Sequence, residues 1–196
     1  RLFGVSLESD GPGVVYDTLG VNGGFFHTPL RWNGELIVEQ IQRRNPDLIA
    51  VMYGANDADS RTIKPESYGR QVARVMERFR AAAPRAACLL LGPPDRRGGR
   101  MLDAETSQLD WIIAVQEETA AAIGCAFLDL REMMGGAGSF DLWQAQGLAQ
   151  PDGVHLTAKG YQRLGQAVAA ELLAAHANYL EEIDSPAHGA DPKELP

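Results

Sequence analysis

One short stretch of this sequence combines a base with a group that could orient it. Asp152 precedes His155 by three residues, so in a short loop its carboxylate can reach the imidazole Nδ1–H. Such a contact fixes the tautomer, leaves Nε2 free as a base and stabilises the imidazolium formed during a reaction. We therefore predict that His155 is a general base and that Asp152 orients it.

Two other stretches offer hydrogen-bond donors. Asn56 presents a side-chain NH₂ directly after an apolar run, and Gly23 presents an unhindered backbone N–H in a glycine-rich loop. Two donors aimed at one point form an oxyanion hole, each contributing on the order of 10²–10³ in rate. We predict this role for Gly23 and Asn56, and a structural hydrogen-bonding role for Asp57. Turns and helix capping would explain each stretch separately, but their combination favours catalysis.

Alternating strands and helices would position these residues. Continuous apolar runs predict buried strands at 48–53, 88–91 and 125–128, preceded by shorter β-type runs at 2–7 and 14–16. Apolar side chains at helical spacing predict helices over 36–41, 68–79, 109–123 and 161–172, with Asn33 and Thr157 as N-caps. This alternation is typical of an α/β fold with a mainly parallel sheet, whose functional loops follow the carboxyl ends of the strands.

Composition excludes several other classes of protein. The 196 residues suit one domain, and 45% hydrophobic with 22% charged residues is typical of a globular protein. A net charge of −8 speaks against a nucleic-acid partner, and no apolar run reaches the ~18 residues of a membrane span. The glycine loop lacks the spacing of a dinucleotide or phosphate-binding motif.

We predict no further site for the cysteines, the other histidines and the arginine cluster. We expect Cys88 and Cys125, in neighbouring predicted strands, to be buried free thiols, with a cross-strand disulfide as the alternative. The other histidines have no cluster of partners, so we expect no metal. The arginine cluster at 96–100 is expected to be a solvated loop, with contact to an anionic glycan as the alternative.

Three sequence blocks resemble the SGNH (GDSL-type) hydrolases, a family of esterases and acyl hydrolases with a flavodoxin-like three-layer α/β/α fold. Gly20-Val21-Asn22-Gly23 resembles the family's second block, Gly54-Ala55-Asn56-Asp57 its third, and Asp152-Gly153-Val154-His155 its fifth. The resemblance covers roughly residues 14–175 and implies catalytic His155 and Asp152 with Gly23 and Asn56 in the oxyanion hole. It implies no cofactor.

The serine block is where the sequence departs from the family. Its nearest counterpart, Gly4-Val5-Ser6-Leu7, has valine in place of aspartate. Ser6 is a weak candidate because the family places a helix between the serine and the glycine block, and Asp10-Gly11-Pro12-Gly13 cannot form one. We expect the serine upstream of Arg1, as in peptidoglycan O-acetylesterase-like members that carry an inserted module. We therefore expect residues 1–12 to be a strand that returns from that module and residues 13–183 to be the hydrolase domain without its serine block. Residues 184–196 are expected to be a disordered tail.

The resemblance implies a serine esterase that removes O-acetyl groups from carbohydrate or peptidoglycan. Lipase, lysophospholipase or thioesterase activity is one alternative, and a non-catalytic glycan-binding member that lost the serine is another. The expected partners are an acetylated glycan or another small ester, and the N-terminal remainder of the same polypeptide. A cell-wall substrate would imply a periplasmic or secreted protein, and an arginine-rich composition suggests a bacterial source.

Overall fold

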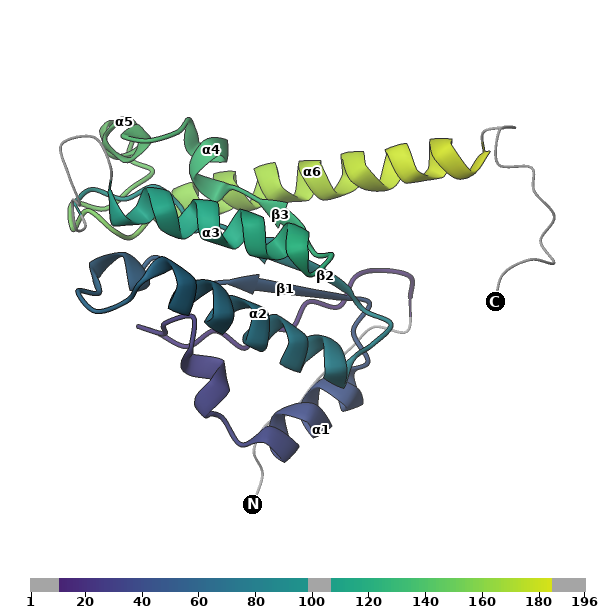
Figure 1. Cartoon of the computed structure of the whole chain (residues 1–196). Helices are drawn as coiled ribbons and strands as arrows, with labels where there is room; N and C mark the ends of the chain where they lie inside the picture. The colour runs from purple at the N-terminus through teal and green to yellow at the C-terminus, as the bar shows by residue number, and fades with distance from the viewer. Residues whose placement is uncertain (1–10, 99–106, 185–196) are drawn as a thin grey trace, which may run out of the picture.

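The described part of the protein, residues 11–98 and 107–184 of a computed structural model, contains a parallel sheet flanked by helices (Figure 1). Its strands are β1 (Leu48–Met52), β2 (Ala87–Leu91) and β3 (Ala126–Leu128), paired in the order β1-β2-β3. Leu89 lies between Ala50 on one side and Ala126 on the other. These are the three longer apolar runs of the sequence, and both their strand character and their parallel pairing are confirmed.

One face of the sheet is covered by three helices, of which the first two along the chain are amphipathic. Helix α2 (Pro65–Ala82) packs on β1 and α1 (Gly34–Arg44), while α3 (Gln108–Ala122) packs on α2, β2 and β3. The predicted cap is present, because the Asn33 side chain accepts a hydrogen bond from Leu36 N at 2.9 Å. Apolar residues from these elements form the larger hydrophobic cluster, which includes Phe26, Val51, Tyr68, Leu90 and Ile112.

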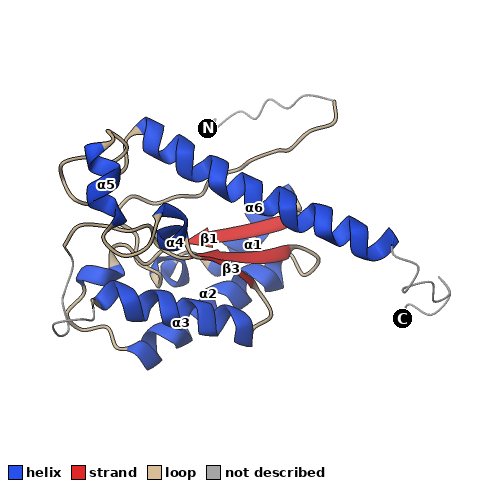
Figure 2. Cartoon of the chain, turned by 90° about the horizontal axis from the view of Figure 1, so that it is seen from above, coloured by secondary structure: helices blue, strands red, loops and turns tan. Residues whose placement is uncertain are grey.

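The opposite face carries α6 (Ala158–Asp184), which crosses the sheet (Figure 2). The short helices α4 (Leu130–Met134) and α5 (Ser139–Ala145) lie at its beginning. A second hydrophobic cluster joins them, made of Leu130, Met134, Phe140, Trp143, Ala149, Leu156 and Leu164. Helices on both faces of a parallel sheet confirm the three-layer α/β/α architecture. No described helix combines the length and apolarity required to cross a membrane.

The strand predicted at residues 14–16 is wrong. Val14, Val15 and Tyr16 are 93%, 61% and 84% exposed, and they form no strand in the described chain. A strand requires a neighbour for its backbone hydrogen bonds, and the edge of β1 away from β2 carries none among the described residues. The expected strand at 2–7 lies outside the described residues, as does the expected tail at 184–196 except for its first residue, Asp184, which ends α6.

The prediction of free thiols is also wrong, because Cys88 and Cys125 form a disulfide. Cys88 lies in β2, and Cys125 immediately precedes β3. Because Leu89 pairs with Ala126, the two cysteines stand opposite each other, with Cα atoms 5.0 Å apart. That separation lies within the range a disulfide spans, so the register of the two strands decided the pairing.

Candidate active site

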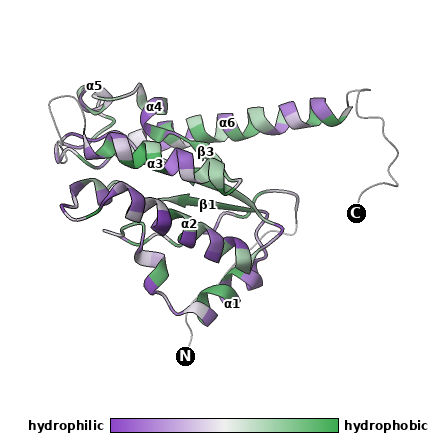
Figure 3. Cartoon of the chain, viewed as in Figure 1, coloured by the Kyte–Doolittle hydropathy of each residue, from purple (hydrophilic) through white to green (hydrophobic). Residues whose placement is uncertain are grey.

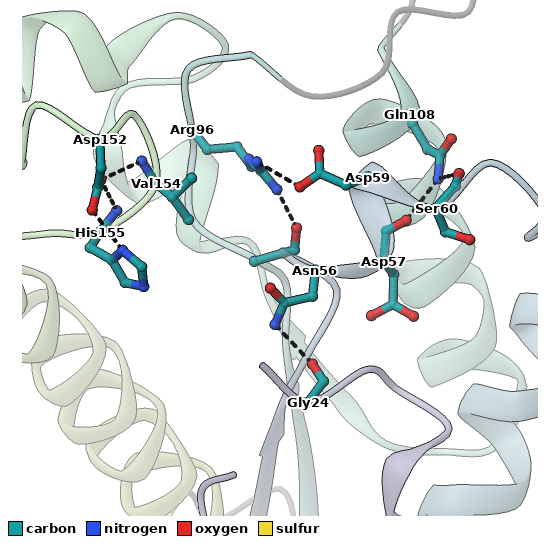
Figure 4. Close-up of polar contacts among 11 residues, drawn as sticks. Gly24, Asn56, Asp57, Asp59, Ser60, Arg96, Gln108, Asp152, Val154 and His155 are labelled. Carbon is teal, nitrogen blue, oxygen red and sulfur yellow. Dashed lines mark hydrogen bonds and ion pairs between the residues drawn. The ribbon is translucent and has the colours of Figure 1, made fainter. Parts of the chain in front are cut away.

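The predicted site residues gather at the carboxyl edge of the sheet (Figure 4). β1 leads into the loop that contains Asn56, and the side-chain Nδ2 of Asn56 donates to the Gly24 carbonyl oxygen at 3.0 Å. This contact joins the glycine loop to the Asn56 loop. The Asp152–His155 loop lies across from them in Figure 4, with the segment that follows β2 between.

Asp152 makes three hydrogen bonds within its loop, two of them with His155. Its Oδ2 lies 2.8 Å from His155 Nδ1, and its Oδ1 accepts from the backbone N–H groups of Val154 and His155, each at 2.9 Å. Those two backbone N–H groups, together with the imidazole, lower the pKa of Asp152 to about 2. Asp152 is therefore a carboxylate at neutral pH. The His155 side chain is 63% exposed, so its Nε2 edge is open to a substrate.

A short two-stranded loop presents this pair. Gln150 N donates to the His155 carbonyl at 2.8 Å, and Thr157 N donates to the Leu148 carbonyl at 2.9 Å, so the loop is closed on both sides. The predicted cap is confirmed, since Thr157 Oγ1 accepts from Gly160 N at 3.2 Å. Gly160 lies so close to the loop that a Cβ there would sit 1.9 Å from the Leu148 oxygen.

The two predicted oxyanion donors are available. Gly23 is exposed, has a φ of 69° and, among the described residues, has no protein acceptor for its N–H. A positive φ of this size favours glycine, which explains the residue type. Asn56 has two side-chain N–H groups, and the bond to Gly24 uses one of them. Their catalytic roles stay predictions.

Asp57 binds the segment that follows the glycine loop. Its fully buried carboxylate accepts from Phe26 N, at 3.1 Å to Oδ2 and 3.3 Å to Oδ1, and Gln108 Nε2 donates to its carbonyl at 2.7 Å. The expected hydrogen-bonding role is thus present. Burial raises the pKa of this carboxyl to about 6, against the lowering effect of the backbone N–H groups.

The prediction of a solvated arginine cluster at 96–100 is wrong for Arg96, whereas the Arg97 side chain is 48% exposed, as expected, and Arg100 lies outside the described residues. The Arg96 side chain is only 8% exposed and its guanidinium bonds the Ala55 carbonyl and Asp59 (Figure 4). The sequence held a signal for this placement. Arg96 follows the buried run 88–91, so a parallel sheet brings it to the same edge as Asn56.

Ser6 lies outside the described residues, and no described serine approaches His155. The hydroxyls of the described serines are each engaged elsewhere, with Thr62, the Lys64 carbonyl, Asp110 N and Asp95 as the respective partners of Ser60, Ser67, Ser107 and Ser139. The described residues therefore include the predicted base, its predicted orienting carboxylate and the two predicted donors, but no serine placed to act as the nucleophile.

Comparisons with known proteins identify the family of the chain and its fold. The family model for the GDSL-like Lipase/Acylhydrolase family matches residues 1–163, and the chain belongs to this family. The fold is similar to that of a peptidoglycan O-acetylesterase, with a TM-score of 0.73 and 26% sequence identity. That match covers 80% of this chain and 45% of the other, so this chain spans less than half the length of that protein.

Two further solved structures share the fold. A lipase/acylhydrolase from Enterococcus faecalis is 21% identical, with a TM-score of 0.57 over 76% of this chain and 71% of its own. A carbohydrate esterase family 3 protein from Talaromyces cellulolyticus is 18% identical, with a TM-score of 0.56 over 80% and 70%. Among the curated proteins, no match was found.

Proposed function

We propose that this chain supplies the base and oxyanion donors of a serine esterase that removes O-acetyl groups from carbohydrate or peptidoglycan. The observation that carries the proposal is the 2.8 Å contact between Asp152 and His155 Nδ1 in a member of the GDSL family. The acetyl group and the glycan are supported by the likeness to a peptidoglycan O-acetylesterase.

The chemistry follows from the geometry of the base and the donors. A serine hydroxyl attacks the ester carbonyl while His155 Nε2 takes its proton, and Asp152 stabilises the imidazolium. Gly23 N–H and Asn56 Nδ2 hold the negative oxygen of the tetrahedral intermediate. His155 then gives the proton to the departing sugar alcohol, which leaves an acetyl-enzyme. Water, deprotonated by His155, attacks that ester, and the proton returns to the serine as acetate leaves.

We further propose that the serine is delivered by sequence upstream of Arg1. Within residues 11–98 and 107–184, the edge of β1 away from β2 pairs with no strand, which supports this, because a parallel strand added there would end next to Asn56. β1 is apolar (Figure 3), and two of its side chains, Leu48 and Met52, are 41% and 52% exposed. In α6, Leu173 is 70% exposed. An unpaired edge and exposed apolar side chains are what an added strand and its connection would bury.

The disulfide supports a periplasmic or secreted location, which we propose for the protein. Disulfides such as Cys88–Cys125 persist in oxidising compartments and are rare in a reducing cytosol. Titration of free thiols in protein isolated from the periplasm or medium is expected to find none at these two positions. Two titratable thiols in that material would contradict the disulfide, and recovery of the protein from the cytosolic fraction of its cells would contradict the proposed location.

Hydrolysis of p-nitrophenyl acetate tests the function. The chain is compared with a version extended upstream of Arg1, each with and without His155→Ala, and with His176→Ala on the exposed side of α6 as the matched control. We expect activity only in the extended form, lost with His155→Ala and kept with His176→Ala. Acetate release from O-acetylated peptidoglycan, set against hydrolysis of a long-chain ester, then tests the substrate.

Each other outcome decides against part of the proposal. Activity in the short chain that depends on Ser6 would contradict the upstream serine. A preference for the long-chain ester would favour a lipase-type activity. Inactivity of both forms would favour a glycan-binding member of the family.

A further inference from the structure

Residues 95–97, which follow β2, contact three separate parts of the molecule. Asp95 makes the first contact, and this residue is only 4% exposed. Its carboxylate accepts from Phe140 N at 2.8 Å and from Ser139 Oγ at 3.4 Å, at the beginning of α5. Asp95 thereby anchors the 95–97 segment in the smaller hydrophobic cluster, to which Phe140 belongs.

Arg96 makes the second contact, to the loop that carries the oxyanion donor. Its Nη1 donates to the Ala55 carbonyl at 2.5 Å, and its Nη2 lies 2.9 Å from Asp59 Oδ2. Ala55 is the residue directly before Asn56. A planar guanidinium that holds two groups at once restrains this loop more tightly than a single donor would.

Arg97 makes the third contact, to the loop that carries the base. Its backbone N–H donates to the Gly153 carbonyl at 2.7 Å, between Asp152 and His155. The approach is close, since a Cβ on Gly153 would lie 3.2 Å from the Cβ of Arg97. Two consecutive residues therefore bond the two halves of the site, and Figure 4 shows Arg96 drawn between them.

We propose that Arg96 is a positioning residue, which sets Asn56 relative to His155 by holding the Ala55 carbonyl. This inference rests on the proposed esterase function. The two loops pack on different hydrophobic clusters, with Phe26 and Ala58 beside Asn56 in one and Ala149 and Leu156 beside His155 in the other. Geometry between separately packed parts needs a direct link, because a shift of about 1 Å costs on the order of 10² in rate.

The surroundings of Arg96 indicate that it adds little to the stability of the fold. Its Nε is buried and, among the described residues, has no hydrogen-bond partner, which is a cost to folding. Asp59 is 56% exposed, so water would solvate its charge if the arginine were removed. Replacing Arg96 by methionine is therefore expected to change the rate much more than the stability.

The test compares Arg96→Met with Arg80→Met. Arg80 is a suitable control because its Nη1 also bonds a backbone carbonyl, that of Ile123 at 2.6 Å, at the other end of the sheet. In the chain of 196 residues, nitrogen NMR signals of the Asn56 side-chain amide and the His155 imidazole report on the two loops. This measurement requires no catalytic activity. We expect both signals to shift or broaden in Arg96→Met and to keep their wild-type positions in Arg80→Met.

Kinetics of the extended polypeptide supply the second readout. We expect Arg96→Met to lower kcat about 10–100-fold with KM within about twofold. Arg96→Lys, which keeps the charge and a single donor nitrogen, should recover part of the loss. Wild-type NMR signals and kcat in folded Arg96→Met, or equal changes in Arg80→Met, would overturn the proposal. If the wild-type extended polypeptide is inactive, the esterase proposal fails, while the NMR comparison still decides whether Arg96 positions the two loops.

Discussion

The two halves of the candidate site each contain an aspartate, and the two carboxylates behave in opposite ways. Asp57, beneath the oxyanion loop, is buried, and burial raises its pKa to about 6. Asp152, beside the base, is 45% exposed, and hydrogen bonds from backbone N–H groups and His155 lower its pKa to about 2. The carboxyl of Asp57 therefore gains a proton as the pH falls through about 6, whereas the carboxyl of Asp152 stays ionised down to about pH 2. Environment, rather than residue type, sets the role.

The halves also differ in how they are held. Phe26 and Ala58 of the oxyanion half lie in the large cluster beneath α2 and α3, whereas the base stands on a tight loop beside the smaller cluster of α4, α5 and α6. The first half is held mainly through the buried residues beneath it. The second half depends more on local hydrogen bonds and on close contacts at Gly153 and Gly160. We therefore expect mutations in the two halves to act through different observables.

Removing the Asp152 carboxylate is expected to have the largest effect. In the extended polypeptide, Asp152→Asn should lower kcat by roughly 10³–10⁴, because an amide no longer stabilises the imidazolium or holds the productive tautomer. Steady-state kinetics with p-nitrophenyl acetate measures this loss. Asp17→Asn is the control, since Asp17 is similarly exposed and pairs with Arg44 instead. A variant at Asp152 with more than about a tenth of wild-type kcat would show that the base needs no orienting carboxylate.

The oxyanion half is expected to give a smaller loss. Asn56→Ala removes one donor and the bond to Gly24, so kcat should fall by roughly 10²–10³ with KM little changed. Asn33→Ala separates catalysis from stability, because it removes only the cap of α1, worth about 1 kcal/mol, and should leave kcat unchanged. A rise in KM with constant kcat would assign Asn56 to substrate binding.

Two glycines of α6 test how the base loop is held. Gly160→Ala forces a Cβ against the Leu148 oxygen and should destabilise the protein by roughly 3 kcal/mol, as measured by urea unfolding. Gly165→Ala, five residues along, meets nothing within 4 Å and should stabilise the exposed helix by up to about 1 kcal/mol. Equal effects at both positions would mean that helix propensity, and not the contact with Leu148, governs the loop.

The smallest effect concerns the pH dependence at Asp57. Its carboxyl has a higher pKa in the folded state than in the unfolded state, so protonation of Asp57 adds to the free energy of unfolding. This contribution is fully present below about pH 4 and is lost as pH rises through about 6. Asp57→Asn removes the titration. The free energy of unfolding of the variant, relative to wild type, should therefore rise by about 2 kcal/mol between roughly pH 4.5 and pH 7.5.

Asp110 provides the opposite case for this measurement. Burial acts to raise its pKa, but hydrogen bonds from Arg131 and Ser107 outweigh it and lower the pKa. Asp110→Asn should therefore lose stability relative to wild type as pH rises through the acid range. The same sign for both variants would contradict the contrast between a buried carboxyl and a paired one.

The sequence by itself determined the features that depend on neighbours within a few residues. Strands 48–52, 87–91 and 126–128 follow from continuous apolar runs, and the caps at Asn33 and Thr157 form with N–H groups three residues ahead. The contact between Asp152 and His155 belongs to the same class, since it spans three residues in a turn. Local spacing limits such contacts to few geometries, so the residue pattern is sufficient to predict them.

Tertiary structure alone decided what depends on segments far apart in the chain. Cys88 and Cys125 pair because the register of β2 and β3 places them opposite each other. Arg96 is buried because a parallel sheet brings the ends of β1 and β2 to one edge, 41 residues apart in sequence at the Ala55 contact. Residues 14–16 have strand-forming side chains but no partner among the described residues. Hydrogen-bond ladders, desolvation and disulfides all need a second segment at a defined place, which no local pattern specifies.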